Sequence, residues 1–444
     1  MSLYSATFYT SDLDYLFSDM RYIEFMLKAE SALIEAQAVH GLVPVSASHQ
    51  IQVVCDRIEN IDVEKIKKEI KLSGNAAIPL VKQITDKVKQ TDPEASKYVH
   101  LGATSQDIVD TATMLLIKEY IEWLNPQLGK LIELLIDLTA KHRNTIMVGR
   151  TLLQQARPIT FGLKSANWLD GIVRLYEKLV IIKPVILKVQ LGGAVGTTNS
   201  YIPGMVRKSY SKILGLHDSL PWHTNRLNLL EWVSYLGMIN VHVGKIAKDV
   251  SLLMQSEIAE LSEGYEQGKG GSSTMPHKRN PVTSLLIMAN ASRSPHLVAS
   301  LYSVMSPEHE RSAGLWHAEW EPLADLMRLT AGSIFNTISL LENLVIDKTR
   351  MEENLEISLG LIYSEEIAFA LSATLGKEQA NEILKSACQK VVEKKKHLRM
   401  ILEEEFPEQT KGLDLNYLFD PSHSLGYYSE IIDAILLHAE NVSK

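Results

Sequence analysis

The side chains best suited to chemistry in this sequence lie in residues 270–281, GGSSTMPHKRNP. Two glycines and two serines before a proline predict a loop, and Asn280 followed by Pro281 predicts the start of a helix. Serine hydroxyls, Lys278 and Asn280 would then lie beside a helix N-terminus, where free N–H groups and the helix dipole favour an anion. An ordinary surface loop that ends in a helix cap is the alternative, and composition alone does not separate the two.

A second polar segment covers residues 100–112, HLGATSQDIVDTA. Thr104, with Asp107 three residues later, resembles a capping box, which predicts a helix start that leaves Ser105 and Gln106 near the helix N-terminus. A plain helix cap without further function is the alternative interpretation.

A third segment covers residues 149–162, GRTLLQQARPITFG. Arg150, Gln154 and Gln155 could face a ligand, and Pro158 is expected to begin a helix. Taken alone, this segment carries little information.

Helices must position these segments, because helical periodicity dominates the chain and no stretch alternates convincingly like a strand in a hairpin. The predicted class is therefore all-α. Asn125 followed by Pro126 is expected to begin one helix. A second helix is expected over residues 226–261, which at 1.5 Å per residue would be roughly 50 Å long. Further long helices are expected over residues 161–190, 281–302 and 322–344.

The apolar faces of these expected helices are wide. In residues 226–261 they include Trp232, Leu236, Ile239 and Val243. Helices this long and this apolar usually need partners, so a bundle completed by other subunits is expected.

Composition excludes several classes of function. The chain has 444 residues, 45% of them apolar, and a formal net charge of −8 that opposes binding to nucleic acid. No apolar run reaches the length of a membrane span, so a soluble cytoplasmic protein is expected. Cys55 and Cys388 are far apart and lack metal-binding spacing, and no metal or cofactor is expected.

Together, the three segments resemble the signature regions of the fumarase/aspartase superfamily. GSSTMPHKRNP is similar to its mobile-loop signature, HLGATSQDIVDTA to its Thr-Ser segment and GRTLLQQARP to its central segment. The resemblance runs from Phe17 to the segment that begins at Met351. It implies a cofactor-free homotetramer of three-domain subunits, with a shared central helix bundle and active sites built from several subunits.

The resemblance also implies a mechanism. A base removes a proton from the carbon next to a carboxylate of a small polycarboxylate substrate, and a group on the neighbouring carbon leaves. Ser272 is the implied base, and Lys278, Asn280 and His100 complete the implied catalytic set. Fixed donors in such a site stabilise the negative charge that develops. The residues implied in substrate binding are Thr104, Ser105, Gln106, Arg150, Gln154, Gln155, Ser273, Met275 and Arg311.

Within the superfamily, three segments resemble the 3-carboxy-cis,cis-muconate cycloisomerase branch more than adenylosuccinate lyase. They are residues 73–83, 220–232 and 308–320. Adenylosuccinate lyase, which releases fumarate, remains the second hypothesis. A catalytically silent structural or binding protein is the third.

One position departs from both enzyme branches, which normally carry a general-acid histidine where this chain has Gln155. Glutamine cannot donate a proton as an acid near neutral pH. Either His100 or water replaces the acid, or the leaving group needs no proton. Arg157 is a second departure, and its charge could bind an additional anionic group.

The expected domains are an N-terminal helical domain over residues 1–103, a central long-helix domain that carries the catalytic loop over 104–347, and a C-terminal helical domain over 348–444.

Overall fold

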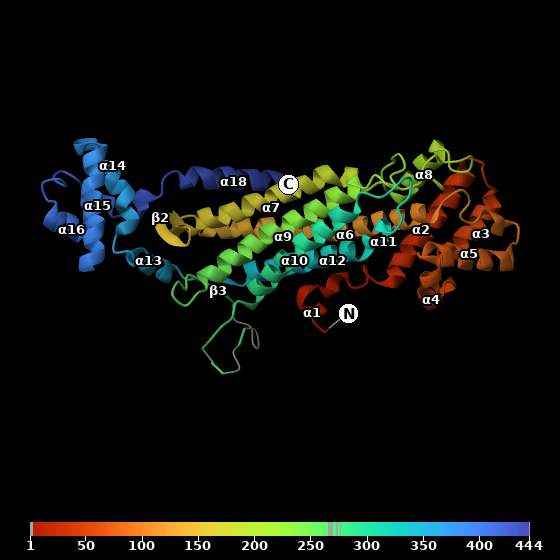
Figure 1. Cartoon of the computed structure of the whole chain (residues 1–444), viewed down its shortest axis with the longest axis horizontal. Coiled ribbons are helices and arrows are strands. Elements are labelled where there is room, and N and C mark those ends of the chain that lie inside the picture. The colour runs from red at the N-terminus through yellow and green to blue at the C-terminus, as the bar shows by residue number, and fades with distance from the viewer. Residues whose placement is uncertain (1–2, 265–269, 272–273, 276, 444) are drawn as a thin grey trace. The chain divides into compact units, whose positions relative to one another are not determined.

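The computed structural model of the protein describes residues 3–264, 270–271, 274–275 and 277–443. Helices dominate the described chain (Figure 1), which confirms the all-α class. The chain divides into two compact units, which we call unit 1 and unit 2. Unit 1 contains Met1–Leu128, Leu175–Val243 and Ala289–Phe335, and unit 2 contains Gly129–Arg174, Gly244–Met288 and Asn336–Lys444.

The structure contains long helices, as the sequence predicted, and both units include residues from them. They are α6 (Ser105–Lys141), α7 (Phe161–Ile186), α9 (Leu227–Leu253), α10 (Val282–Val304) and α12 (Trp320–Glu342). The expectation of a helix over residues 226–261 was too long at its C-terminal end, because α9 ends at Leu253 and turns precede the next strand.

Pro126 does not begin a helix, contrary to the expectation from the sequence. It lies inside α6, which continues from Ser105 to Lys141. A proline in a helix interior costs about 3 kcal/mol because it removes a hydrogen bond and crowds the preceding turn. The neighbours Leu124 and Leu128 are both fully buried, so packing on either side offsets that cost.

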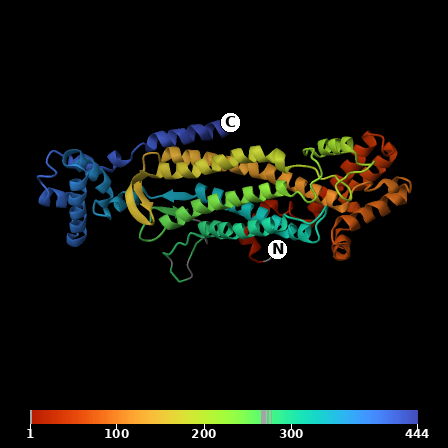
Figure 2. The same ribbon diagram turned by 45° about the horizontal axis from the view of Figure 1, so that its top comes forward.

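The N-terminal part of unit 1 consists of shorter helices. They are α1 (Ser5–Phe8), η1 (Ser11–Leu13), α2 (Asp19–Val39), α3 (Val45–Cys55), η2 (Ile58–Asn60), α4 (Val63–Ser73), α5 (Ala77–Thr91) and η3 (Ala95–Tyr98). The same unit contains α8 (Gly204–Leu214) and α11 (Leu315–Ala318). Helix α2 packs against both α3 and α8 (Figures 1 and 2). These two helices therefore each cover part of the surface of α2.

Aromatic side chains form part of the core of unit 1. The Trp232 ring packs edge-on against Tyr120 at 5.7 Å and stacks on Tyr235 at 5.8 Å. The buried hydroxyl of Tyr120 donates to the carbonyl of Met327, and that of Tyr235 donates to the carbonyl of Leu175. Burial raises the pKa of both phenols, so each remains a neutral donor.

Unit 2 contains the C-terminal helices. They are α13 (Lys348–Glu356), η4 (Leu361–Tyr363), α14 (Ser364–Leu375), α15 (Lys377–Lys394), α16 (Leu398–Glu405), α17 (Leu415–Leu418), η5 (Pro421–Ser424) and α18 (Tyr428–Ser443). Ile367, Leu371, Leu398 and Ile401 are fully buried in one apolar cluster there. Val148 joins the same cluster and ties the central segment to the C-terminal helices.

The central segment is a β-hairpin, which the sequence analysis did not predict. Strand β1 (Ile146–Thr151) pairs antiparallel with β2 (Gln154–Thr160). Pro158 lies in β2 opposite Val148 and does not begin a helix; helix α7 starts later, at Phe161. A proline is tolerated in a two-stranded sheet because one side of each strand has no ladder to complete.

The hairpin turn lacks the residues that usually signal it. Leu152 and Leu153 form the turn with φ of 50° and 66°, a left-handed conformation that normally favours Asn-Gly. Their side chains are 97% and 77% exposed. The local sequence therefore carries no hairpin signal, and the turn is a strained, apolar tip.

A second strand pair joins β3 (Leu261–Glu263) to β4 (Leu344–Ile346) in unit 2. Within the residues described, no helix is long and apolar enough to cross a membrane. Cys55 is buried in α3 and Cys388 is partly buried in α15, and burial raises the pKa of both thiols.

Candidate active site

His100 lies in unit 1, in the turn between η3 and α6. Its Nδ1 lies 2.6 Å from Oε1 of Glu30, a buried carboxylate on α2. Because a carboxylate only accepts hydrogen bonds, Nδ1 is the donor and Nε2 stays available. Burial lowers the pKa of His100, but the charge of Glu30, with a smaller contribution from Asp107, outweighs it and raises the pKa above the ordinary histidine value.

Neighbouring side chains fix the conformation of the turn around His100. His100 has φ of 57° and Gly102 has φ of 80°, both in the left-handed region. Gln37 donates to the carbonyl of Leu101 at 2.8 Å, and Asn199 donates to the carbonyl of Gly102 at 2.8 Å. A Cβ on Gly102 would lie 2.8 Å from Oδ1 of Asn199, so glycine is required here.

Asp107 connects this turn to two other segments of unit 1. Its carboxylate accepts from the backbone N–H of Thr104 at 3.1 Å, which is the carboxylate half of the predicted capping box. It also accepts from the N–H groups of Gly192 and Gly193, both at 2.9 Å, and from His223 Nε2 at 2.8 Å. Thr104 and Ser105 are partly buried at the resulting N-terminus of α6.

Gln106, a predicted substrate-binding residue, is directed into the interior of unit 1. It is buried, and its amide nitrogen donates to Asp110 at 3.1 Å and to the carbonyl of His223 at 3.0 Å. The amide nitrogen of Gln106 is therefore used in hydrogen bonds inside unit 1. Arg311, another predicted binding residue, lies partly buried in the connection between α10 and α11.

A buried ionic network surrounds Gln106. Arg226 donates to both oxygens of Asp110, at 2.6 and 3.1 Å, and also pairs with Glu319. Trp316 Nε1 donates to Asp110 at 3.0 Å. Burial raises the pKa of Glu319 to about 7, against the lowering effect of Arg226. One guanidinium thus compensates two buried carboxyl groups.

Arg150 belongs to unit 2 and is already paired. Its guanidinium donates to both oxygens of Glu260, at 2.9 and 2.6 Å, and Glu260 is fully buried. A bidentate pair of this kind is strong and directional. The Arg150–Glu260 pair therefore holds the β1–β2 hairpin to the residue that directly precedes β3.

Gln155 lies in β2, at the position where the two branches named above are expected to carry a general-acid histidine. Its Nε2 donates to the backbone carbonyl of Asn354 at 3.1 Å, and the Asn354 amide donates to Glu260 at 2.7 Å. The structure therefore uses Gln155 to join β2 to α13. Gln154, beside the hairpin turn, is exposed.

Arg157 does not offer the free positive charge that the sequence suggested. It pairs with Glu365 at 2.5 Å and Glu366 at 2.6 Å, and donates to the carbonyl of Ser424 at 2.8 Å. These contacts link β2 to η5 and α14. Two carboxylates therefore balance the charge of Arg157 in this structure.

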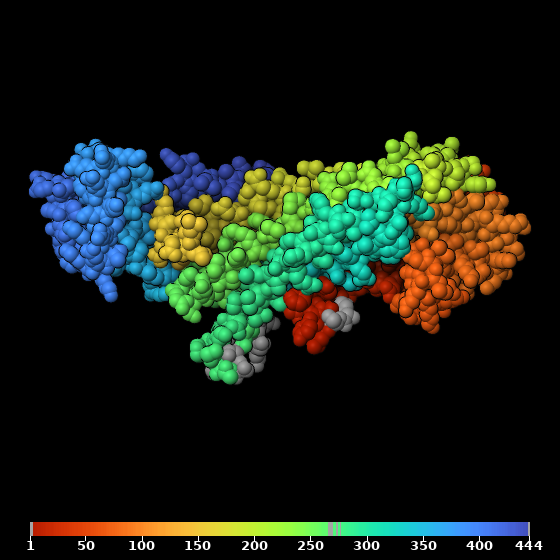
Figure 3. All heavy atoms as spheres, viewed as in Figure 1, coloured from red at the N-terminus to blue at the C-terminus, as the bar shows by residue number. Residues whose placement is uncertain are grey.

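Of the signature loop, Ser272 and Ser273 lie outside the described residues. Met275 and Lys278 are exposed, and Asn280 is partly buried. The described part of this loop is drawn in green in Figure 3. The Asn280 N–H donates to the carbonyl of Gly270 at 2.9 Å and closes the base of the loop. Gly270 has φ of 69°, and a Cβ there would lie 2.7 Å from the Asn280 carbonyl oxygen. Glycine is therefore required where the two ends of the loop come close together.

The N-terminus of α10 already binds an anion, which is a carboxylate of the same chain. The buried Glu263 carboxylate accepts from the N–H of Thr283 at 3.0 Å and from the N–H and hydroxyl of Ser284, both at 2.8 Å. The expected anion site at this helix N-terminus is therefore occupied by Glu263. Strand β3 and α10 are thereby joined on either side of the signature loop.

Replacing Glu263 by alanine should lower the free energy of unfolding by about 1–2 kcal/mol, because the N–H groups that it caps lose their acceptor. Glu263→Gln keeps one acceptor oxygen and should lose less. Chemical denaturation of the two variants beside the unmodified protein measures the difference. Equal stability of all three proteins would contradict the capping role.

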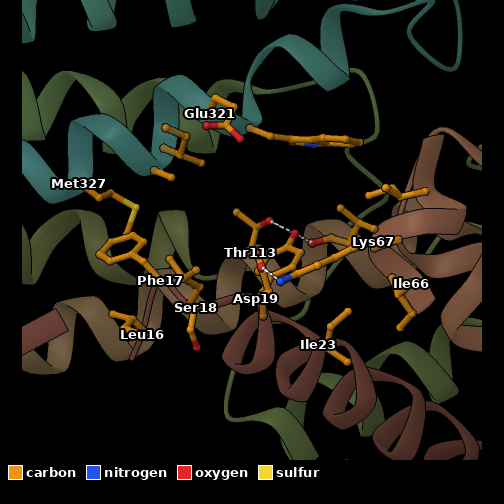
Figure 4. Close-up of a pocket in the computed structure, with 18 of the residues that line it drawn as sticks. Leu16, Phe17, Ser18, Asp19, Ile23, Ile66, Lys67, Thr113, Glu321 and Met327 are labelled. Carbon is orange, nitrogen blue, oxygen red and sulfur yellow. Dashed lines mark hydrogen bonds and ion pairs between the residues drawn. The ribbon is translucent and has the colours of Figure 1, made fainter. Parts of the chain in front are cut away.

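A cavity of about 380 Å³ in unit 1 lies apart from these groups (Figure 4). Phe17, Ile23, Ile66 and Met327 form part of its apolar wall. Lys67 at its edge pairs with Asp19 at 2.7 Å. None of the described residues predicted for the active site lines this cavity, so we do not assign the chemistry to it.

The structure thus brings the predicted residues together in two groups. His100, Thr104, Ser105 and Gln106 lie along one turn and helix start in unit 1, and Arg150 and Gln155 lie on one hairpin in unit 2. Sequence reasoning missed the carboxylates that hold these groups: Glu30, Glu260 and Glu263. They are distant in sequence from their partners, so no local pattern could identify them. Asp107 alone had a local signal, its capping-box spacing.

Comparison with protein families gives two matches. The model of the family described as Lyase matches residues 8–294, and the model described as Adenylosuccinate lyase C-terminus matches residues 360–435.

Among curated proteins, the chain is 40% identical over 448 residues to the 3-carboxy-cis,cis-muconate cycloisomerase of Acinetobacter baylyi, covering 100% of this chain and 99% of that protein. It is 38% identical to the nitrosuccinate lyase of Streptomyces davaonensis, covering 94% and 90%. Among solved structures, it is similar to the 3-carboxy-cis,cis-muconate lactonizing enzyme of Pseudomonas putida, with a TM-score of 0.93, 37% identity and complete coverage of both chains.

The similarities to the cycloisomerase and to the lactonizing enzyme each extend over the whole chain. Their identities are far above the level at which only a fold is shared. The chain therefore belongs to the lyase family of the fumarate lyase superfamily, and it is an all-helical enzyme.

Proposed function

We propose that the protein is a cycloisomerase of the 3-carboxy-cis,cis-muconate type. In the ring-closing direction, a carboxylate oxygen of the substrate bonds to one carbon of a double bond, and the electron pair moves toward the carboxylate on the other carbon. A proton then joins that second carbon. In the ring-opening direction, the base removes this proton and the C–O bond breaks, which releases a carboxylate.

The similarity over the full length of the chain to a protein named as a 3-carboxy-cis,cis-muconate cycloisomerase carries this proposal, and Gln155 is compatible with it. The amide nitrogen of Gln155 is engaged with the Asn354 carbonyl at 3.1 Å, and glutamine is no acid near neutral pH. A carboxylate is a stable leaving group and needs no proton. A reaction with such a leaving group is therefore compatible with glutamine at this position. The structural similarity to a protein named as a 3-carboxy-cis,cis-muconate lactonizing enzyme supports the same proposal.

In this proposal Ser272 is the base, and Lys278 and Asn280 stabilise the negative charge that develops on the carboxylate. Ser273, Met275, Gln154 and Arg311 contact the substrate, together with Thr104 and Ser105 at the start of α6. We propose that Arg150, Gln106 and Gln155 act by holding their segments in place, because hydrogen bonds already engage their side chains.

We also propose a cytoplasmic homotetramer with active sites shared between subunits, and domains over residues 1–103, 104–347 and 348–444.

A second candidate is the elimination of a different stable anion from a substituted succinate. Gln155 is compatible with it for the same reason, and the similarity to a protein named nitrosuccinate lyase supports it. Adenylosuccinate lyase is disfavoured, since its leaving group is an amine that benefits from a proton.

An ultraviolet assay against 3-carboxymuconate, its lactone, adenylosuccinate and a panel of substituted succinates tests the proposal. We expect turnover of the first two compounds. Turnover of adenylosuccinate alone would refute the cycloisomerase, and turnover confined to a succinate with a stable anionic leaving group would establish the second candidate instead.

A further inference from the structure

Glu30 and His100 form a buried carboxylate–imidazole pair. The resemblance includes His100 in the catalytic set, but the proposed steps require no proton from it and give Glu30 no role. Glu30 is 2% exposed and lies on α2, while His100 lies 70 residues away at the start of the α6 segment. Their atoms Oε1 and Nδ1 are 2.6 Å apart. A buried carboxylate is costly unless it is paired and hydrogen-bonded, so the contact with His100 offsets the cost of burying Glu30.

The surroundings of the pair favour a positive charge on His100. Asp107 on α6 adds a second negative charge near the ring. Cys55 on α3 and Tyr210 on α8 lie near Glu30, and burial raises the pKa of each of these two groups, so both stay neutral. Opposite charges close to a histidine stabilise its imidazolium form.

The backbone places the ring for this role. The left-handed φ of 57° at His100 is strained for a residue with a side chain, although histidine tolerates it better than most. Gln37 and Asn199 hold the carbonyls of the next two residues. With Nδ1 bound to Glu30, Nε2–H is the ring donor that remains for a ligand.

We propose that Glu30 is a positioning residue that keeps His100 as an imidazolium cation, so that unit 1 presents a fixed positive charge to a carboxylate of the substrate. This inference rests on the proposed function for the identity of the substrate. Because the leaving group needs no proton, the charge on His100 serves to bind a carboxylate and to stabilise the negative charge that develops on it.

The direction of the pH dependence follows. Because the pKa of His100 in the folded protein lies above its ordinary value, the pair stabilises the fold fully below about pH 6.5, and this contribution is lost as pH rises through the raised value. Affinity for a polycarboxylate should fall over the same upper range.

The test compares the unmodified protein with Glu30→Gln, an isosteric change. Deuterium exchange at the His100 ring Cε1–H, read by mass spectrometry across pH, gives the titration midpoint of this histidine without any substrate. We expect a midpoint above about 6.5 in the unmodified protein. In Glu30→Gln it should fall by about 1–3 pH units, because the opposite charge is removed and burial remains.

Tricarballylate serves as the ligand probe, with its affinity measured by calorimetry. At about pH 8, Glu30→Gln should bind it at least about tenfold more weakly, since each unit of pKa lost lowers the protonated fraction about tenfold. The difference in affinity between the two proteins should narrow as pH falls toward about 5, because a larger fraction of His100 in the variant then becomes protonated.

Two controls accompany the experiment. Glu35→Gln removes another carboxylate of α2, one that contacts Gln52, and should leave the His100 midpoint unchanged. In the same spectra, His142 should titrate below its ordinary value, because burial and then the charges of Lys348 and Lys141 lower its pKa.

A His100 midpoint that is not raised in the unmodified protein, or that is unchanged in Glu30→Gln, would overturn the inference. A lowered midpoint with unchanged tricarballylate affinity would overturn the carboxylate-binding role. The exchange experiment needs no turnover, so its result is separate from any failure of the protein to act on 3-carboxymuconate.

Discussion

Replacing Ser272 by alanine should lower kcat by about 100- to 10,000-fold, which is the usual contribution of a general base. The methyl group of alanine cannot remove the proton next to the substrate carboxylate. The described residues of this loop are exposed or partly buried, so the variant should fold and assemble like the unmodified protein. Steady-state kinetics on the substrate identified by the ultraviolet panel, together with light scattering for the oligomer, measure both effects.

Ser300→Ala provides the matched control, because Ser300 is exposed on α10 and its substitution should leave kcat unchanged. Undiminished turnover by Ser272→Ala would remove this serine from the role of base. A loss of activity together with dissociation of the proposed tetramer would point to a structural function of the loop instead.

Replacing Arg226 by methionine should lower the free energy of unfolding by about 3–5 kcal/mol. Arg226 is 3% exposed and compensates both Asp110 and Glu319. Without it, two carboxyl groups remain buried with no cation between them, and the stacking of the guanidinium on the Trp222 ring is also lost. Chemical denaturation followed by circular dichroism measures the change.

Arg399→Met is the matched control, because Arg399 pairs with Glu403 on an exposed helix surface. Such a pair contributes about 0.3–0.5 kcal/mol. The loss in Arg226→Met should also shrink at acidic pH, where the orphaned carboxyl groups take up protons and their burial costs less. A small loss that does not change with pH would show that packing around Arg226 dominates over its charge.

The long helices could be predicted because their apolar residues repeat with the period of the helix, as in α7, α10 and α12. Pro126 misled the prediction because a local signal for a helix start was outweighed by burial of Leu124 and Leu128. The hairpin was missed because Leu152 and Leu153 adopt a turn conformation that their side chains disfavour. Tertiary context decided both cases.

The candidate site also contains some contacts that could be predicted from the sequence and others that could not. The capping contact between Thr104 and Asp107 spans three residues and could be predicted from spacing. The Arg150–Glu260 pair spans 110 residues and the Glu30–His100 pair spans 70, so neither leaves a local pattern. The sequence therefore indicated the polar groups of the site but not the carboxylates that hold several of them.

The state of the two native thiols makes the protein convenient to label. Maleimides react with thiolates, and burial keeps Cys55 and Cys388 in the less reactive thiol form. A cysteine introduced at the exposed tip of the hairpin, as in Leu152→Cys, would therefore react first. One fluorophore attached there would report on the surroundings of the hairpin, with no need to remove either native cysteine.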